Sequence, residues 1–291
     1  MKTAKLAKSY RIDDGKHFRL KDFDPADTGN WYSVEEANER LQKDVARMEK
    51  LQDKLYAQGC WSLLLIFQAM DAAGKDGTIK HVMSGVNPEG CQVYSFKVPS
   101  ATELQHDFLW RTTLHLPESG HIGIFNRSYY EEVLIVRVHP KALEAENIPP
   151  SLVTKNVWEE RFEDIRGFER HMARNGTVIR KFFLHLSKKE QKRRFLARLD
   201  EPGKNWKFSA ADIHEREYWD DYQKAYEDMI RNTATKHAPW YVIPADNKWY
   251  AHLAVSAAIV ETLEELNLAY PKVDAAKRKE LQAARKALAK K

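Results

Sequence analysis

The feature that most restricts how this chain can fold is an apolar run that leads directly into a turn of small residues. Residues 63–67 read LLLIF, and residues 72–74 read AAG immediately before Lys75. So short a run without polar positions predicts a strand buried on both faces of a parallel sheet. The small side chains would let backbone N–H groups close on an anion at the start of the following helix. This stretch therefore predicts an anion-binding turn, with Lys75 supplying positive charge.

The turn matches the phosphate-binding P-loop pattern G-x-x-x-x-G-K-[ST] only in part. Ala69 replaces the first glycine, and Asp76 replaces the Ser or Thr that holds magnesium. Residues 78–83 read as the helix that should follow, which is the setting the pattern requires. Asp71 lies inside the turn, where a carboxylate repels phosphate unless a divalent cation lies between them. Asp71 is thus a candidate magnesium ligand; the alternative is an ordinary strand-turn-helix junction with Lys75 as a solvated charge.

A second apolar strand, predicted over residues 122–125, ends in Asn126 and Arg127. In P-loop folds a second buried strand ends in an acidic residue that helps to hold the metal. Asn126 brings no charge, but its carbonyl oxygen can coordinate a cation directly or through water. Arg127 is placed to reach a phosphate oxygen in the same cleft. The alternative is a turn with an exposed arginine.

Positive charge is concentrated in one segment. Residues 178–207 contain ten Lys or Arg and three Asp or Glu residues, a local charge of +7 against +5 for the whole chain. Such an excess predicts a polyanionic ligand at one place, and nucleic acid is the first alternative, although no recognised nucleic-acid motif is present. Ser187 begins a helix on which Arg194 and Arg198 repel each other, so an anion between them would explain their spacing. The alternative is a solvated helix face.

The chain divides into an N-terminal arm (1–30), a main domain (31–270) and a basic C-terminal helix (271–291). Within the main domain we expect a helix over 102–116 and a cationic helical lid over about 187–235, whose second helix begins at Ser209. No signal peptide and no run of the roughly 18 apolar residues of a membrane span is recognised. Two cysteines give no disulfide framework, so a cytoplasmic setting is expected.

Six separated motifs in one order resemble the polyphosphate kinase type 2 family over roughly residues 30–270. They are DAAGK at 71–75, NRSYY at 126–130, FLAR at 195–198, WK at 206–207, WDDY at 219–222 and APW at 238–240. The resemblance implies a three-layer α/β/α P-loop kinase fold, similar to thymidylate kinase, with a parallel central sheet and a helical lid. The chain departs from the family in two motifs. The first motif of the family begins Gly-x-Asp and continues Gly-Lys-Gly-Gly, whereas this chain has Ala69 in place of the first glycine and Asp76 after Lys75. The second motif of the family begins with Asp, whereas this chain has Asn126.

The resemblance also implies an activity, which is transfer of the terminal phosphoryl group of inorganic polyphosphate to a nucleotide. The NRSYY motif followed by Glu131-Glu132-Val133 resembles the class III branch, which accepts both AMP and ADP. The expected cofactor is Mg²⁺, with Mn²⁺ as the alternative metal. We expect a cytoplasmic homo-oligomer, a dimer or tetramer, without nucleic-acid or membrane partners. The alternatives are an ATP-dependent nucleoside monophosphate kinase and a non-catalytic nucleic-acid-binding module.

The site residues predicted from the sequence fall into three groups. The catalytic residues are Asp71, Lys75 and Arg127, and the metal ligands are Asp71 and Asn126. The predicted phosphate-binding set comprises Ala72, Ala73, Gly74, Lys75, Asp76, Gly77, Thr78, Lys80, Arg127, Lys181, Arg193, Arg194, Arg198, Lys204 and Lys207.

Overall fold

The computed structural model describes residues 6–29, 31 and 33–289, and in this part of the chain six strands form one sheet. The strand order is β1-β6-β5-β2-β4-β3. The strands are β1 (Arg11–Ile12), β2 (Ser62–Gln68), β3 (Cys91–Ser95), β4 (Ile122–Asn126), β5 (Thr177–His185) and β6 (Trp240–Pro244). β3, β4, β2, β5 and β6 are parallel, as expected, while the two-residue β1 pairs antiparallel with β6 and makes the sheet mixed.

The apolar run of residues 63–67 lies in the middle of this sheet. β2 is hydrogen-bonded to β4 on one side and β5 on the other, and all seven of its residues are buried. Its alternate side chains enter two different cores, because successive residues of a strand point to opposite faces. Leu63, Leu65 and Phe67 belong to one core, and Leu64 and Ile66 to the other. Burial on both faces favours apolar side chains in the middle of the strand, which explains the unbroken run. The polar residues at its two ends are hydrogen-bonded, Ser62 to Thr177 and Gln68 to Glu131.

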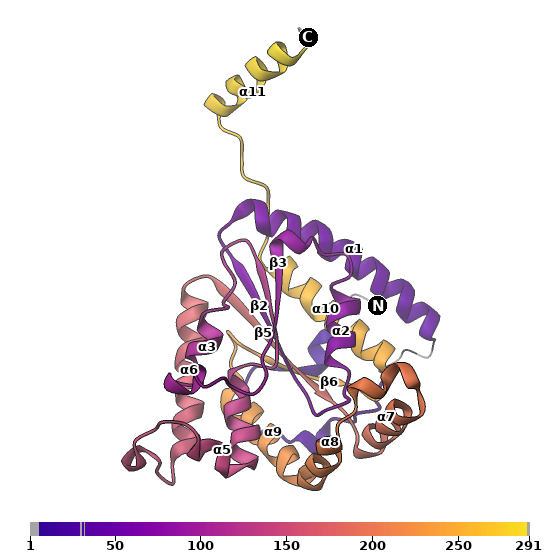
Figure 1. Ribbon diagram of the computed structural model, residues 1–291. Coiled ribbons are helices and arrows are strands. Elements are labelled where there is room, and N and C mark those ends of the chain that lie inside the picture. Colours follow the sequence, from indigo (N-terminus) through magenta and orange to yellow (C-terminus); the bar gives the residue numbers. More distant parts are fainter. Residues whose placement is uncertain (1–5, 30, 32, 290–291) are drawn as a thin grey trace.

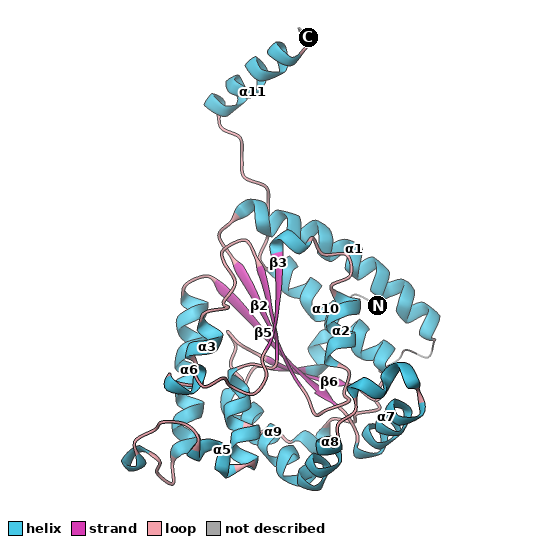
Figure 2. Ribbon diagram, in the orientation of Figure 1, coloured by secondary structure: helices cyan, strands magenta, loops and turns pink. Residues whose placement is uncertain are grey.

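Helices cover both faces and complete a three-layer α/β/α fold (Figures 1 and 2). One face carries α1 (Val34–Gln58), α2 (Lys75–Val82) and α10 (Lys248–Glu265). The other carries α6 (Val157–Arg174), α9 (Trp219–Thr233) and the short α4 (Ile135–Val138). The short helices α3 (Trp110–Thr113) and α5 (Pro140–Glu144) lie on the side of α6 and α9 in Figure 1. The expected fold class is therefore confirmed.

Side-chain caps set several helix boundaries, including the one predicted at Ser187. Ser33 caps α1 by accepting a hydrogen bond from the Glu36 backbone N–H, and Gly59 ends the helix at a φ of 62°. Ser187 caps α7 (Lys188–Asp200) by accepting from the Glu190 backbone N–H. Each cap satisfies backbone groups that the first or last helical turn leaves without a partner.

The helix predicted over residues 102–116 is wrong. The structure has a 3₁₀ turn at Glu103–Gln105 and only one helical turn in α3. The side chains of Ser100 and Asp107 accept hydrogen bonds from the backbone N–H groups of Glu103 and Leu109. These local bonds favour turns over a continuous helix.

The N-terminal segment is more closely packed than the expected surface arm. Residues 1–5 and 30 lie outside the described residues, but Tyr10, Phe18 and Leu20 are each 5% exposed. The Tyr10 hydroxyl lies 2.7 Å from that of Tyr250 on α10, and β1 extends the sheet. The segment is thus part of the packed body, because its few apolar residues lie against both cores.

The expected lid divides into a protruding part and a core part. α7 is followed by a 3₁₀ segment (Pro202–Lys207), α8 (Ala210–Glu215) and a 3₁₀ turn (Arg216–Tyr218), so the helix predicted from Ser209 is interrupted before α9. Tyr226, Met229 and Ile230 of α9 are buried in the core beside α6. Within the expected lid, the segment before α9 therefore forms α7 and α8, which lie at one end of the sheet (Figure 1).

The C-terminal helix α11 (Ala275–Leu288) extends away from the body and buries none of its residues (Figure 1). Among the described residues, no helix has the length and apolar character needed to cross a membrane.

Candidate active site

The loop after β2 has the strained backbone typical of an anion-binding turn. Ala72 and Gly74 adopt φ angles of 65° and 103°, and the strain at Ala72 is notable because left-handed backbone is unfavourable for a residue with a Cβ. α2 begins at Lys75, whose Nζ atom donates to the carbonyl oxygen of Ala69 across 3.1 Å. Burial, together with the positive charge of Arg127, lowers the pKa of Lys75 to about 8. A phosphate bound at this helix start would raise the pKa of Lys75, because its negative charge favours the protonated amine.

Arg127 lies beside this loop because β2 and β4 are parallel neighbours in register. Phe67 pairs with Asn126, so the ends of both strands reach the same edge of the sheet. The Arg127 guanidinium donates to Asp71 and to Glu131, each across 2.9 Å. The negative charge of Glu131, followed by that of Asp71, raises the pKa of Arg127. The structure therefore brings together the predicted residues Asp71 and Arg127, and Arg127 adopts a φ of 66°, as strained side-chain-bearing residues at functional sites often do.

Asn126 and Asp76 form a second polar pair at the mouth of the loop. The Asn126 Nδ2 atom donates to the Asp76 carboxylate across 2.7 Å and lies 3.3 Å from the Ser95 hydroxyl. Asp76, predicted as a phosphate-binding residue, brings a carboxylate that can approach phosphate only through a cation or water.

Oxygen donors suited to magnesium surround this loop. Asp71 and Asp76 offer carboxylates and Asn126 an amide oxygen, and hard oxygen ligands are what Mg²⁺ requires. Among residues 6–29, 31 and 33–289, no three His, Cys, Asp or Glu side chains form a metal cluster. In kinases, one or two carboxylates share Mg²⁺ with substrate phosphates and water. The residues present therefore fit a substrate-bound Mg²⁺.

Arg194, predicted from the sequence to bind phosphate, is instead hydrogen-bonded within the protein. Its side chain is 5% exposed, and all five of its N–H donors are used within the protein. Nε donates to Glu190, and the two Nη atoms donate to the carbonyl oxygens of Ala72, Ala73, Ala245 and Asp246 at 2.6–3.0 Å. Arg194 thus joins α7 to the phosphate-binding loop and to the end of β6, and has no donor left for phosphate.

Lys181, also predicted to bind phosphate, is buried inside the protein. It points from β5 into the protein interior, with no exposed surface, and its Nζ donates to Glu169, to the Tyr130 hydroxyl and to the Thr233 carbonyl oxygen at 2.7–2.9 Å. A strand with both faces buried leaves Lys181 no route to solvent. Its role is therefore internal pairing with Glu169, not phosphate binding.

The remaining predicted cations lie on α7 and the segment after it. Arg193 is 69% exposed and pairs with Glu190, while Lys204 pairs with Glu201 at the surface. Arg198 is 22% exposed, with its Nη1 atom 3.5 Å from Asp212. Lys207 lies 5.0 Å from the ring centroid of Trp206. These side chains are reachable from solvent, unlike those of Arg194 and Lys181.

The residues of α2 are divided between surface and interior. Lys80 is exposed, Gly77 is half-buried, and Thr78 is 2% exposed.

Lys248 at the start of α10 was not predicted as a site residue, although it lies near the cations of α7 and of the segment after it. Burial lowers its pKa, and the charges of Arg194, Lys204 and Arg193 lower it further. An anion among these groups would relieve their repulsion.

Gln191 ties the protruding segment to the loop. It is 1% exposed, donates from Nε2 to the Asp71 carbonyl oxygen across 3.0 Å and accepts from Arg216 across 2.8 Å. Together with Arg194, it fixes α7 over the loop.

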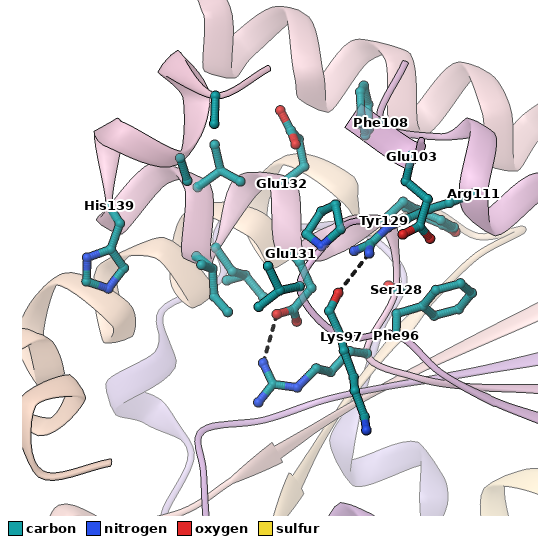
Figure 3. A pocket seen from close by; sticks show the side chains of 18 of the residues that line it. Phe96, Lys97, Glu103, Phe108, Arg111, Ser128, Tyr129, Glu131, Glu132 and His139 are labelled. Atoms are coloured by element: carbon teal, nitrogen blue, oxygen red, sulfur yellow. Dashed lines mark hydrogen bonds and ion pairs between the residues drawn. The ribbon is translucent and has the colours of Figure 1, made fainter. Parts of the chain in front are cut away.

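A cavity of about 730 Å³ adjoins the Arg127 ion pairs and was not expected from the sequence (Figure 3). It extends from Asp71 past Arg127 to Phe108 and Glu146, and α8 contributes Asp212. Eight Asp or Glu residues line it, against three Lys or Arg residues. Its size and mixed aromatic and polar lining are typical of sites for small organic molecules. The residues that line the cavity come from loops distant in sequence, and only the tertiary structure brings these loops together.

Comparisons with known proteins agree with this geometry. The family model for Polyphosphate kinase 2 (PPK2) matches residues 31–271. A protein named ADP-polyphosphate phosphotransferase from Rhodopseudomonas palustris is 56% identical over 284 residues, covering 94% of this chain and 98% of the relative. One named AMP/ADP-polyphosphate phosphotransferase from Meiothermus ruber is 49% identical over 273 residues, with the same two coverages.

A solved structure gives the same result. The crystal structure of Polyphosphate Kinase 2 from Arthrobacter aurescens TC1 is 40% identical, superposes with a TM-score of 0.86 and covers 96% of each chain. The resemblance first carried by the separated motifs is confirmed over the whole domain, and the chain belongs to the polyphosphate kinase 2 family.

Proposed function

We propose that the protein transfers the terminal phosphoryl group of inorganic polyphosphate to AMP and to ADP, forming ADP and ATP. The observation that carries this proposal is the position of Arg127. Its guanidinium binds Asp71 of the loop on one side and Glu131 of the cavity on the other. Arg127 thus lies where a phosphate on the loop and a nucleotide in the cavity would meet.

The charges on the two sides of this meeting point differ, which supports the assignment of donor and acceptor. Solvent-accessible cations gather on α7 and around Lys248, and a polyanion of variable length needs such an open, positive surface. Among the residues that line the cavity, carboxylates outnumber cations by eight to three and would repel a long polyphosphate chain. A nucleotide, whose base and ribose are uncharged, suits the cavity better.

Lys75 and Arg127 would act on the transferring group. Phosphoryl transfer needs positioning and stabilisation of charge on the equatorial oxygens more than covalent chemistry. Lys75 at the start of α2 and the Arg127 guanidinium would lie on either side of that group, and backbone N–H groups of the loop would hold the donor phosphate. Mg²⁺, or Mn²⁺ in its place, would neutralise phosphate charge near Asp71 and Asn126.

Acceptor choice is the finer part of the proposal. The names of the two relatives differ, since one gives ADP alone and the other AMP and ADP. The neutral Asn126 supports acceptance of both, because it leaves the cleft with one negative charge fewer than an aspartate would. The class III assignment therefore predicts product from either nucleotide.

A homo-oligomer, a dimer or tetramer, in the cytoplasm completes the proposal. β3 lies at the edge of the sheet with Val93 52% exposed, and such an edge is suited to contact with a second copy. Cys60 and Cys91 are free thiols, which suits a reducing compartment. Size-exclusion chromatography with light scattering measures the oligomeric state directly.

The activity is tested by incubating the protein with Mg²⁺, polyphosphate and AMP or ADP, without ATP. ADP or ATP should form, whereas an ATP-dependent monophosphate kinase would give no product and a nucleic-acid-binding module no turnover. Lys75→Ala serves as the site control, because loss of one preorganised electrostatic contact costs about 10²–10³ in rate. Its unchanged melting temperature would show that the fold survives. A fully active Lys75→Ala protein would refute the assigned site.

A further inference from the structure

The C-terminal helix α11 carries a concentrated positive charge outside the site described above. Residues 275–288 include five Lys or Arg residues and one acidic residue, Glu280, which gives a local charge of +4. Glu280 forms an ion pair with Lys277 of the same helix across 2.6 Å. The other cations of α11 form no ion pair with any residue that the structure describes, and they are Arg278, Lys279, Arg285 and Lys286.

These four cations lie on one side of the helix, which we call the cationic face of α11. Consecutive residues of an α-helix are about 100° apart around its axis, so the four side chains fall within an arc of about 120°. Arg278 and Arg285 are seven residues apart, as are Lys279 and Lys286, and seven residues correspond to about 10 Å along the axis. Like charges arranged in this way repel one another, and a linear polyanion along the face would relieve the repulsion.

The cationic face is open to solvent because α11 stands apart from the body. The chain after α10 is held to the body as far as Leu268, which is 7% exposed, and Tyr270, whose hydroxyl donates to Asp53. Every residue from 271 to 289 is exposed. A helix of 14 residues without tertiary contacts is only marginally stable in water, so a bound ligand would also stabilise the helix itself.

We propose that the cationic face of α11 is a second binding site for inorganic polyphosphate, which holds a distant part of a long chain while the end of that chain occupies the active site. The inference rests on the proposed function, which supplies polyphosphate as the donor. It adds a binding surface outside the active site and a preference for long chains.

The preference for long chains follows from the position of α11. α7, which Arg194 joins to the phosphate-binding loop, lies at the end of the body opposite α11 (Figure 1). A compact chain of 291 residues is about 50 Å across, so a short polyphosphate cannot reach both sites. A long chain held at α11 is tethered to the protein, which raises its effective concentration at the active site.

The side chains of α11 favour a bare phosphate polymer over other polyanions. Proteins that bind single-stranded nucleic acid combine cations with aromatic rings that stack on bases, and α11 has no aromatic residue. Helices that lie in a membrane interface carry large apolar side chains such as Trp, Phe and Leu opposite their cations. α11 has only Leu281 and Leu288 among alanines. Polyphosphate offers negative charge and no bases, and charged side chains alone are enough to bind it.

Two pairs of lysines give a matched comparison. Lys279→Gln/Lys286→Gln removes two charges from the cationic face of α11. Lys43→Gln/Lys50→Gln is the control, because it removes two exposed lysines that are also seven residues apart, but from α1 on the body. Glutamine has nearly the helix propensity of lysine, so both helices should persist.

Binding of tripolyphosphate and of a chain of about 100 phosphates, measured by calorimetry at two salt concentrations without nucleotide, tests the inference. The α11 variant should bind the long chain about tenfold more weakly than wild type at low salt and show a smaller salt dependence. Its affinity for tripolyphosphate should equal that of wild type. The α1 control should match wild type with both ligands, and Arg278→Lys/Arg285→Lys, which keeps the charge, should do the same.

Several outcomes would overturn the inference while leaving the proposed activity intact. They are an unchanged affinity of the α11 variant for the long chain, an equal loss in the α1 control, and an equal loss for tripolyphosphate. A different oligomeric state of the α11 variant in light scattering would indicate that α11 contacts a second copy instead. Tighter binding of a single-stranded oligonucleotide or of anionic lipid vesicles than of the long chain, lost in the same variant, would identify nucleic acid or membrane as the ligand.

The proposed activity can fail separately from this inference. A wild-type protein that binds long polyphosphate through α11 but forms no product from AMP or ADP would contradict the proposed activity and leave the second binding site standing.

Discussion

The guanidinium of Arg194 lies 2.8 Å from the carbonyl oxygen of Ala73, so α7 is hydrogen-bonded directly to the phosphate-binding loop. An arginine that the charge pattern placed among the phosphate-gripping side chains is instead part of the framework that shapes the loop. The two lid arginines therefore have different roles, although they are one helical turn apart. This difference can be tested by comparing matched variants.

Arg194→Ala should lower both stability and activity. The change removes the side-chain donor from four backbone carbonyl oxygens and one of the two arginine partners of Glu190, which we expect to cost about 3 kcal/mol. For a domain of this size that corresponds to a melting temperature lower by about 6–12 °C. Differential scanning fluorimetry measures the shift.

Arg198→Ala is the matched control, since Arg198 is partly exposed and its contacts with Asp212 and Lys207 are 3.4–3.5 Å long. It should change the melting temperature by no more than about 2 °C, because partly exposed ion pairs contribute little to stability. Its apparent affinity for polyphosphate should fall and become less dependent on salt. Equal melting temperatures for both variants would contradict the division of roles.

Lys181→Met should destabilise the protein without a direct effect on phosphate binding. The substitution leaves Glu169 buried and uncompensated, which typically costs about 3–5 kcal/mol. Urea unfolding should show this loss, and the double variant Lys181→Met/Glu169→Met should recover part of it because no buried charge remains. The KM for polyphosphate of the folded protein should stay close to the wild-type value. A large rise in KM at unchanged stability would restore Lys181 to the phosphate-binding set.

His185 should make the protein less stable as the solution becomes acidic. It is 7% exposed, and burial lowers its pKa to about 4. Between about pH 6.5 and pH 4 the unfolded chain binds a proton that the folded protein excludes, so the free energy of unfolding falls as pH decreases through this range. The shift sets an upper limit of about 3 kcal/mol for this loss, which ends below pH 4. Urea unfolding of wild type and His185→Gln at pH 7 and pH 4.5 measures it, and an equal pH dependence in both would contradict the assignment.

The sequence predicted features that depend on local pattern or on strand order. The apolar run of β2, the start of α7 at Ser187 and the meeting of Asp71 with Arg127 all follow from residues near in sequence or from parallel register. It could not predict which charged side chains would be buried. Lys181 and Arg194 read as ordinary members of a basic segment, because their partners Glu169 and the Ala245 carbonyl lie in other elements.

The cavity illustrates the same limit. Phe108, Glu132 and Glu146 come from three connecting segments, and no spacing in the sequence shows that they meet. The expected helix over 102–116 also obscured the loop that carries Phe108 to the cavity. Loop conformations there depend on short side-chain bonds such as that from the Leu109 N–H to Asp107, which compete closely with helix formation.

The pair formed by Asn126 and Asp76 offers the sharpest test of the metal assignment. Their side chains are 2.7 Å apart, so Asn126→Asp would place two carboxylates in contact. Repulsion between them should lower the melting temperature in EDTA, and a divalent cation between them should restore it. The Mg²⁺ concentration for half-maximal activity should therefore decrease in Asn126→Asp and increase in Asp76→Asn. The exchanged double variant Asp76→Asn/Asn126→Asp restores one carboxylate and one amide, and should return towards wild type. If all three variants require the same Mg²⁺ concentration as wild type, this pair does not contact the metal.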